Sequence, residues 1–595
     1  MVVSREEAPR EWVPVEDRFL GLDRRTFKAG FTALAVALVL IYGLQALNAA
    51  IPWHNEIQAG QVLDLGSGAT AVPPVGWQLE SGTLTGGAGA TATSLQVLLA
   101  SGGATIEMRG ASYDGSATGF LDQVERSESD TPGVTGARGT LTTDAGLVGV
   151  VQSRTGPSGD GIDVAFKMAT GTTQEVDSAP ALLVRVRTAS GQFERYQDDV
   201  GALLRSITPG GGAMSVVSEE KTAQLRAIEE SGWGAPFRFL RPDNVAFWVY
   251  LLGVGGGALT MLRYFGPGAT FYTPALAGGV VLFGLYLVPW LLLLRHHNRF
   301  TSQPAGLLAA GFVWGGVAAT FWIALPANSA LLAIWAKVGG TSFASDWGAG
   351  LTAPINEEWG KAIGLVLLIG LAPRLVRSAY DGFIIGAFIG LGFQVFEDVL
   401  YVYNGATQLY GVDQLGSSLR VFVTRGAAGI VSHALFSAIF CAGLMWVLGR
   451  TPGERKVVRG VLTMLMAMVF HFAWDDMAAL SGGTVAAAVL PFAIAAVELV
   501  ALFYVLRHAA GQERRWMRDL LGPEVEAGVI DPALLDAVSG LRKDRRKYRK
   551  HLHSRSEARH RLEAAHDLAR EIARADGTET PPVTHARQEL QRLQT

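Results

Sequence analysis

The feature that most constrains this chain is a succession of apolar runs, each long enough to cross a bilayer of roughly 30 Å. The first run covers about 29–50. The others lie near 244–262, 271–294, 305–325, 352–372, 380–403, 421–448, 459–479 and 484–506. Apolar residues make up 49% of the 595 residues and charged residues 17%, a balance that excludes an ordinary soluble protein. The sequence therefore predicts a polytopic α-helical membrane protein with about 8–10 spans.

Basic residues around the apolar runs predict their orientation. Residues 1–28 form a polar N-terminus that ends in Arg18, Arg24, Arg25 and Lys28. This basic flank places the N-terminus in the cytoplasm. The run at 29–50 is a retained transmembrane anchor, because it is long and no small-residue cleavage site follows a short core. Basic loops at 374–377 and 450–459, and the tail after Arg507, mark the same side.

The number of spans conflicts with this orientation. Nine spans would put the two termini on opposite sides, whereas the basic residues put both inside. Two explanations remain open from the sequence. Either Leu331–Val338 forms an extra short or re-entrant segment, or the Gly-rich run 244–262 does not cross. Residues 244–345 would carry the first spans after the anchor, and residues 346–507 would form the protease-like membrane core described below.

Between the anchor and these spans, residues 55–210 are rich in Gly, Ser and Thr, with short alternating apolar runs. Strands are predicted at Leu95–Leu99, Gly161–Phe166 and Leu182–Arg187, and helices near Phe120–Arg126 and Tyr196–Ile207. We expect an extracytoplasmic α+β domain that acts as a binding or sensing module, because it shows no catalytic pattern. Residues 211–243 would be a linker with a helix at Glu219–Glu230.

Residues 508–595 are charged and helix-forming, and we expect a helical cytoplasmic tail. Its basic stretch Arg542–Lys550 suits anionic lipid or nucleic acid. A solvated helix held near an anionic leaflet is the favoured interpretation, with no specific nucleic acid as a partner. The single cysteine, Cys441, lies in an apolar run and is expected to be an unreactive thiol. It excludes a disulfide framework and a thiolate zinc cage.

Charged residues inside apolar runs need a reason, because each costs about 2.5–3.5 kcal/mol to insert. The first such group, Glu357, Glu358 and Lys361, opens the run 352–372. Glu357 and Lys361 are four residues apart and share a helix face, whereas Glu358 is turned by about 100°. One carboxylate can pair with the lysine while the other stays free as a base. An interfacial cap pair explains this motif equally well when it is taken alone.

The run 380–403 supplies a second group. Glu397 lies four residues before Tyr401, so the phenol can reach the carboxylate. Earlier on the same run, Gly382, Gly386 and Gly390 form a ridge of small residues at a spacing of four. Such a ridge lets a neighbouring helix approach closely.

The last two runs supply histidines. Arg425 and His433 lie in the run 421–448, with His433 about thirteen residues into it, and His471 lies in the run 459–479. Taken alone, a histidine in an apolar helix is more often a satisfied core residue than a ligand. Asp475, one turn after His471, can fix its tautomer or raise its basicity.

Depth in the membrane groups these residues. At 1.5 Å per residue, Glu357 and Glu397 lie roughly 8 Å and 9 Å below one membrane face. On the same count His471 lies roughly 12 Å and His433 roughly 18 Å below it. All four fall in one leaflet, the outer one if the basic loops are cytoplasmic. Because independent structural caps would not need to agree in depth, we predict one shared site.

Two kinds of hydrolytic chemistry suit this site. A glutamate can take a proton from water while a histidine polarises the carbonyl or binds the oxyanion. Alternatively His433, His471 and Glu397 ligate a metal such as zinc, which leaves Glu357 or Glu358 as the base. The sequence has no His-Glu-x-x-His motif, so it leaves the requirement for a metal open.

In their order along the chain, these motifs resemble the PrsW family of intramembrane proteases and, more distantly, the CAAX-protease and bacteriocin-processing membrane enzymes. The resemblance covers about 350–480. The matching pieces are Glu357-Glu358-x-x-Lys361, Asp381-Gly382, Gly390-Leu-Gly-Phe393, Glu397-x-x-x-Tyr401, Arg425 with His433, and His471-x-x-Trp474. Asp398 and Asp475 depart from the pattern, since asparagine is expected at both places.

The resemblance implies a multi-pass protease of the bacterial plasma membrane that cuts membrane-anchored regulators, anti-sigma factors among them, on the extracytoplasmic side. The expected catalytic residues are Glu357, Glu358, Glu397, His433 and His471, supported by Lys361, Tyr401, Arg425 and Asp475. A proton-coupled transporter or channel is the alternative, with the buried acids as a relay. It would favour inverted repeats, which are not evident. A non-enzymatic membrane sensor would leave the intramembrane charges unexplained.

Overall fold

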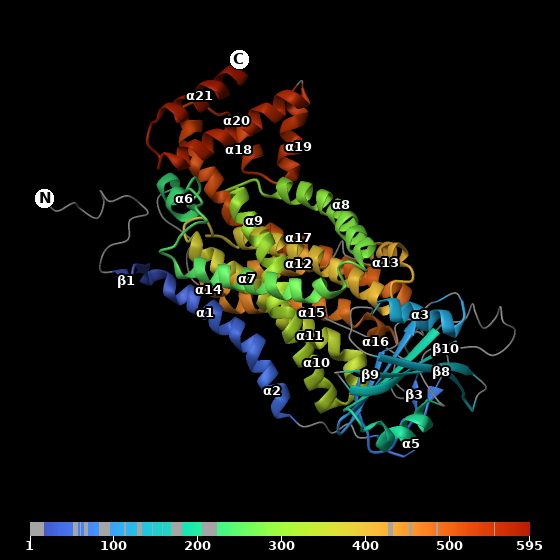
Figure 1. The fold of residues 1–595 in the computed structure, drawn as a ribbon. Coiled ribbons are helices and arrows are strands. Elements are labelled where there is room, and N and C mark those ends of the chain that lie inside the picture. Colours follow the sequence, from blue (N-terminus) through green and yellow to red (C-terminus); the bar gives the residue numbers. More distant parts are fainter. Residues whose placement is uncertain are drawn as a thin grey trace.

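The structure is a computed structural model, and its long helices form a bundle between two smaller units (Figure 1). A β-rich domain lies at one end of the bundle and a cluster of short helices at the other. Described are residues 17–594 apart from 52–56, 60, 65–69, 82–95, 112, 114, 128–133, 145–146, 157–158, 168–180, 205–222, 427–431, 452–454, 483–485 and 553. Within these residues, seven helices are long and apolar enough to cross a membrane.

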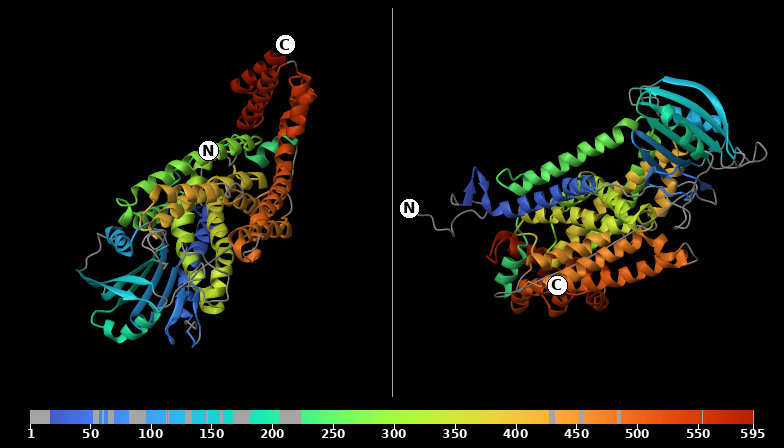
Figure 2. Two further views of the ribbon diagram at one scale, coloured as in Figure 1. Left: turned by 90° about the vertical axis from the view of Figure 1, so that its right-hand side faces the viewer. Right: turned by 90° about the horizontal axis from the view of Figure 1, so that it is seen from below.

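The helices of the bundle follow the predicted apolar runs. They are α1 (Phe27–Leu38) with α2 (Leu44–Ala50), α7 (Val245–Phe265), α8 (Thr273–His297), α9 (Ala305–Val313) with α10 (Leu325–Gly339), α11 (Thr341–Leu371), α12 (Ala379–Gln408), α14 (His433–Leu448), α15 (Val457–Asp475) and α17 (Ala486–Glu526). π-helical stretches join α1 to α2 and α9 to α10. Figure 2 shows these helices side by side along the bundle. A polytopic membrane protein is therefore confirmed.

Three helix boundaries differ from those expected. The run at 305–325 continues through α10, so Leu331–Val338 is the end of a long helix and not a separate segment. The next helix begins at Thr341 rather than near 352, directly after Gly340, whose φ of 89° ends α10. The last span does not stop at 506 but continues without a break to Glu526.

The run at 421–448 is not a single helix. Helix α13 (Gln414–Val421) passes into a π-helical turn, Phe422–Gly426, and α14 begins only at His433. Residues 427–431 lie outside the described ones. His433 is therefore the first residue of its helix, and the prediction that it lies thirteen residues into an apolar helix is wrong.

Two contacts define the ends of the bundle. The Asp23 amide donates to the Asp243 carbonyl over 2.7 Å, so α1 and α7 begin at the same end. At the other end the Lys337 ammonium, on α10, donates to the carbonyls of Asn48 and Ile51 over 2.7 and 3.0 Å. The run 244–262 forms the full-length helix α7, which is long and apolar enough to cross a membrane, but whether it crosses stays a prediction. The side of the membrane on which each end lies stays a prediction.

The β-rich domain follows the first span. An antiparallel sheet of seven strands has the order β5-β6-β7-β11-β10-β9-β8. Its strands are β5 (Gln78–Ser81), β6 (Gln96–Ser101), β7 (Ala104–Ala111), β8 (Val134–Thr142), β9 (Val148–Gly156), β10 (Gly159–Lys167) and β11 (Ala181–Thr188). Two-stranded pairs also form, β1 (Arg18–Phe19) with β2 (Leu22–Asp23) and β3 (Leu63–Asp64) with β4 (Thr70–Ala71). The α+β class is confirmed, although Leu95 and residues 205–207 of the predicted elements lie outside the described residues.

One helix covers each face of this sheet. Helix α5 (Phe193–Leu203) buries Tyr196 and Val200 against one face. On the other face, α3 (Ala117–Ser127) buries Phe120 together with Tyr410, which follows α12. Gln123 on α3 also donates to the Tyr410 carbonyl over 2.6 Å. The domain is thus attached to the end of the bundle at which α12 stops.

The tail folds as a helical cluster with its own core, and its basic stretch forms a mostly exposed helix, as predicted. Its helices are the end of α17, α18 (Pro532–Val538), α19 (Arg542–His551), α20 (Arg555–Arg574) and α21 (Pro581–Gln594). The linker helix α6 (Ala223–Ser231) belongs to this cluster, because the Trp516 indole donates to Glu230 over 2.8 Å inside it. The β-rich domain and α6 therefore lie at opposite ends of the bundle. Residues 205–222, which connect them, lie outside the described residues, and so does the part of the predicted linker helix at 219–222.

Candidate active site

The glycine ridge on α12 brings two of the predicted site helices together. A β-carbon on Gly386 would stand 2.5 Å from the Ser437 carbonyl oxygen, and one on Gly390 would stand 2.2 Å from that of His433. Only hydrogen fits in these places, so α12 and α14 pack backbone against backbone. This close approach places His433 beside Glu397, and the predicted role of the ridge is confirmed.

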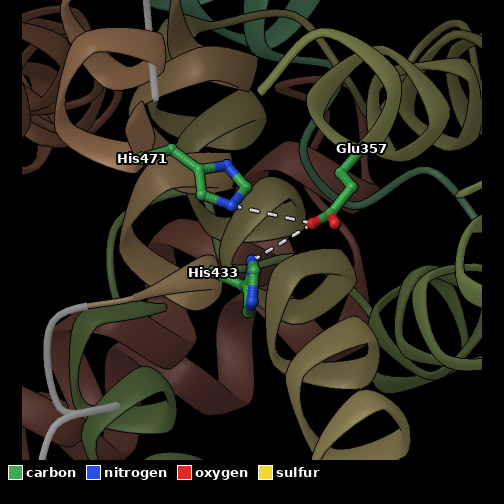
Figure 3. A group of neighbouring side chains, drawn as sticks. All are labelled: Glu357, His433 and His471. Carbon is green, nitrogen blue, oxygen red and sulfur yellow. Dashed lines mark ion pairs between the residues drawn. The ribbon is translucent and has the colours of Figure 1, made fainter. Parts of the chain in front are cut away.

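Glu357, His433 and His471 form the centre of the site, and Figure 3 shows their side chains converging from three helices. Glu357 Oε2 lies 3.6 Å from His433 Nδ1 and 3.7 Å from His471 Nε2. All three side chains are buried. The Asn328 amide, on α10, donates to the other Glu357 oxygen over 3.0 Å and so fixes the carboxylate.

Lys361 contacts both neighbouring carboxylates. Its ammonium donates to Glu358 over 2.7 Å and lies 3.4 Å from Glu357. Ser437 donates to the second Glu358 oxygen over 2.9 Å. One of the two carboxylates had been expected to stay free of the lysine. Both contact it, and Glu358 is held more firmly. The lysine ammonium also lies 3.1 Å from His433 Nδ1. One buried cation therefore contacts two acids and a histidine.

Glu397 lies on the far side of the His433 ring. His433 Nε2 is 2.9 Å from Glu397 Oε2, which also accepts from the Arg425 guanidinium over 2.5 Å. Arg425 donates to Asp398 as well and lies over the Tyr401 ring, 3.9 Å from its centre. Tyr401 thus contacts Arg425, and it also lies within electrostatic range of Glu397, the partner predicted for it.

His471 is surrounded by carboxylates. Its Nε2 lies 3.4 Å from Asp475 Oδ2, as the spacing of four residues predicted, and its Nδ1 lies 3.3 Å from Glu358. The Phe436 ring stacks on the imidazole, with the centroids 4.9 Å apart. Within the described residues, neither nitrogen of His471 makes a hydrogen bond of regular geometry. Two buried ring nitrogens without such bonds are an arrangement that a further ligand would complete.

The donor set fits a divalent metal, although its members differ from those expected. One ligand atom each from Glu357, His433 and His471 lie within 4.8 Å of one another, and two imidazoles with a carboxylate are ligands that zinc accepts. The predicted set had Glu397 in place of Glu357. Glu397 faces Nε2 of His433, whereas Glu357 faces Nδ1 and His471, so Glu397 lies outside the group.

The structure brings the predicted residues together, but the depth count that grouped them was partly wrong. His433 is the first residue of α14, so the depth of roughly 18 Å does not apply to it. Glu357 follows Thr341 by sixteen residues, roughly 24 Å of helix, because α11 begins earlier than its apolar run. Asn328 was missed, although an amide within the long apolar segment was an available signal.

Together, the fold and the site define a multi-pass membrane protein with a buried centre of acids and histidines suited to hydrolysis. Residues 303–506, about a third of the chain, match the sequence model of the PrsW family of intramembrane metalloproteases. This part of the chain is therefore a PrsW family protease region, which confirms the resemblance. No curated protein and no solved structure matches the chain significantly.

Proposed function

We propose that the chain is an endopeptidase that hydrolyses peptide bonds of membrane-anchored proteins near the extracytoplasmic face of the bacterial plasma membrane. The observation that carries this proposal is the buried group of Glu357, His433 and His471 inside the region that matches the protease family. Hydrolysis needs a base for water and a positive partner for the carbonyl oxygen, and this group offers both. The family match favours a peptidase over a transporter or a sensor.

Glu357 is the proposed general base. Asn328 holds one of its oxygens, and the other lies between the two histidines, where it can take a proton from water. Glu358 is less suited to this role, because Lys361 and Ser437 occupy both of its oxygens. We propose that Glu358 instead fixes the position of the Lys361 ammonium, which supplies positive charge to the site.

The two histidines are the proposed partners of the substrate carbonyl, and each is oriented by an acid. Glu397 accepts from His433 Nε2 in the tautomer that carries the proton there, which leaves Nδ1 facing Glu357. Asp475 lies at His471 Nε2. Acids of this kind fix the ring orientation and raise the basicity of the imidazole.

Glu357, His433 and His471 would hold a metal ion if one is bound. The chemistry that such an ion supplies is Lewis-acid polarisation of a peptide carbonyl. Glu357 would then be a ligand and not the base. Glu397, at Nε2 of His433, and Glu358, at Nδ1 of His471, would orient the two ligating imidazoles from outside the group. Zinc is the ion that this donor set suits best.

The position of the site supports cleavage near one membrane face. His433 begins α14 and His471 lies four residues before the end of α15, so both lie toward the same end of these two helices, although α12 continues for eighteen residues beyond Gly390, which His433 contacts. That end also carries the β-rich domain, through Tyr410. We propose that this end faces the extracytoplasmic side, because the basic loops lie at the opposite ends of these helices.

The test is cleavage of single-span membrane proteins co-reconstituted with the full-length chain. Glu357→Gln and His471→Ala should each lower the rate by about 10²-fold or more, while the protein stays folded in the membrane. Glu498→Gln is the matched control, because Glu498 is equally buried in the matched region but lies on α17, outside the site. Full activity in both site variants would exclude the assignment. Mass spectrometry of the products separately tests the side of cleavage.

A further inference from the structure

Helix α8 lies on the outside of the bundle and ends in basic residues (Figure 1). Leu291, Leu292 and Leu293 are exposed by 39, 64 and 47%, as expected for a surface that contacts acyl chains. Arg295 and His296 follow after the buried Leu294, and both are exposed. A lipid-facing helix that turns from leucine to arginine in this way marks the level of the phospholipid headgroups.

The basic helix α19 lies beside this end of α8, although more than 240 residues separate the two along the chain. Arg542, Arg545 and Arg549 are all within electrostatic range of His296. Burial, together with the nearby Arg299 and Arg549, lowers the pKa of Arg545 to about 10. The fold thus brings two basic segments together at headgroup level, where their charges repel one another.

The basic residues of α19 are not neutralised within the protein. The helix has seven of them: Arg542, Lys543, Arg545, Arg546, Lys547, Arg549 and Lys550. Among the described residues, none of the seven forms an ion pair. The one acid of the helix, Asp544, caps its first turn by accepting from the Leu541 amide, and Glu563 on α20 is the acid near Arg545.

The neighbouring tail helices behave differently. On α20, Arg561 pairs with Glu557 over 2.7 Å and Arg570 pairs with Asp567 over 2.8 Å. On α21, Arg592 pairs with Glu589 over 2.6 Å. The same tail therefore pairs its cations in two helices and leaves a third basic. This contrast indicates that the counter-charge for α19 comes from outside the chain.

We propose that α19 and the adjoining end of α8 form one binding surface for the headgroups of anionic phospholipids. This basic surface consists of Arg295, His296 and the seven basic residues of α19. Phosphate groups would supply the missing negative charge, as they do for basic segments next to membrane spans. Lipid is the occupant that the position favours, because the surface continues the lipid-facing side of α8. The inference is independent of the proposed peptidase activity.

Lipid retention by the purified full-length protein tests this inference. Native mass spectrometry in a neutral detergent would count bound phosphatidylglycerol and phosphatidylcholine from an equal mixture. We expect the wild type to retain phosphatidylglycerol preferentially. Removing Arg542, Arg546 and Arg549 together, each by substitution with Gln, should lower that retention about tenfold or more.

A second set of substitutions removes the same charge from exposed arginines elsewhere in the tail. Arg559→Gln, Arg570→Gln and Arg592→Gln, combined in one protein, should leave phosphatidylglycerol retention unchanged. If this control loses as much lipid as the α19 variant, net charge and not the basic surface binds the lipid, and the inference is wrong. Size-exclusion chromatography of both variants checks that they stay folded.

Two further comparisons test the composition of the surface and the nature of its ligand. Arg295→Gln with His296→Gln should also reduce retention, and unchanged retention would overturn the composite surface. Inorganic phosphate or a single-stranded RNA oligomer at equal phosphate concentration should not displace the lipid. Displacement by phosphate alone would identify a free-anion site, and preferential binding of RNA would make a nucleic acid the partner.

Discussion

Gly390 and His433 are in contact through their backbones, and a β-carbon on Gly390 would stand 2.2 Å from the His433 carbonyl oxygen. The position of a site histidine is thus determined by a residue without a side chain on the neighbouring helix. His433 is the first residue of α14 and follows Ser432, whose backbone is not helical. Contact with α12 is therefore what fixes His433 next to Glu397.

We predict that Gly390→Ala abolishes activity, because the added methyl group must push α14 away from α12. Overpacking of this kind typically costs about 1–3 kcal/mol in stability, so the protein should still fold. Cleavage of a co-reconstituted substrate should fall by about 10²-fold, since small misplacements of a catalytic group have effects of this size.

Gly284→Ala is the matched control for this substitution. Gly284 also lies in a membrane helix, α8, but nothing lies within 4 Å of the place where its β-carbon would be. The control should keep full activity and gain slightly in thermal stability, because alanine favours a helix over glycine. Equal loss of activity in both variants would show that glycine is needed for a reason other than the approach of α14.

Periodicity and spacing predicted the bundle, the glycine ridge and the contact of His471 with Asp475, because these depend on residues of one helix or on a local pattern. They did not predict where helices begin. The residues before His433 are mostly apolar, so a prediction from hydropathy alone places the start of the helix too early. Thr341–Leu351 is less apolar, yet it is helical because it packs against α10.

The sequence also could not assign the two nitrogens of His433. Spacing along one helix says which residues share a face, but the ring nitrogens of His433 meet residues of two other helices. Whether Glu357 or Glu397 joins the histidines depends on how those helices are rotated about their axes. This rotation is set by packing in three dimensions, so the sequence could not show that Glu357, rather than Glu397, lies between the two histidines.

Lys361 should be essential for stability, because it is a buried cation between two buried acids. Lys361→Met leaves Glu357 and Glu358 without their partner, and breaking a buried pair in this way costs about 3–5 kcal/mol. Lys361→Met with Glu358→Gln should recover part of the lost thermal stability, because only Glu357 is then left without the lysine. Neither variant should cleave substrate. If the double variant is no more stable than the single one, the pair does not act as a unit.

Asp475 stands where asparagine is expected from the family resemblance, and we predict that the charge is dispensable while the hydrogen-bond acceptor is not. Asp475→Asn should keep activity within about tenfold of wild type, because the amide oxygen can still contact the His471 ring. Asp475→Ala should lose about 10–100-fold, the usual effect of removing the orienting partner of such a histidine. Equal activity of the two variants would show that Asp475 does not orient His471.

Metal content distinguishes the two possible ligand sets. If Glu357, His433 and His471 hold a divalent ion, the purified full-length protein should contain about one equivalent of metal per chain, and a chelator should remove it together with activity. Glu357→Gln should lower the measured metal content strongly, whereas Glu397→Gln should lower it less, because Glu397 contacts His433 from the opposite side. Elemental analysis measures this without relying on cleavage. A greater loss of metal from Glu397→Gln would restore Glu397 as the ligand. Full activity of metal-free protein would show that no metal is needed. Glu357 would then act as the base, and Lys361 and the histidines would stabilise the carbonyl oxygen without an ion.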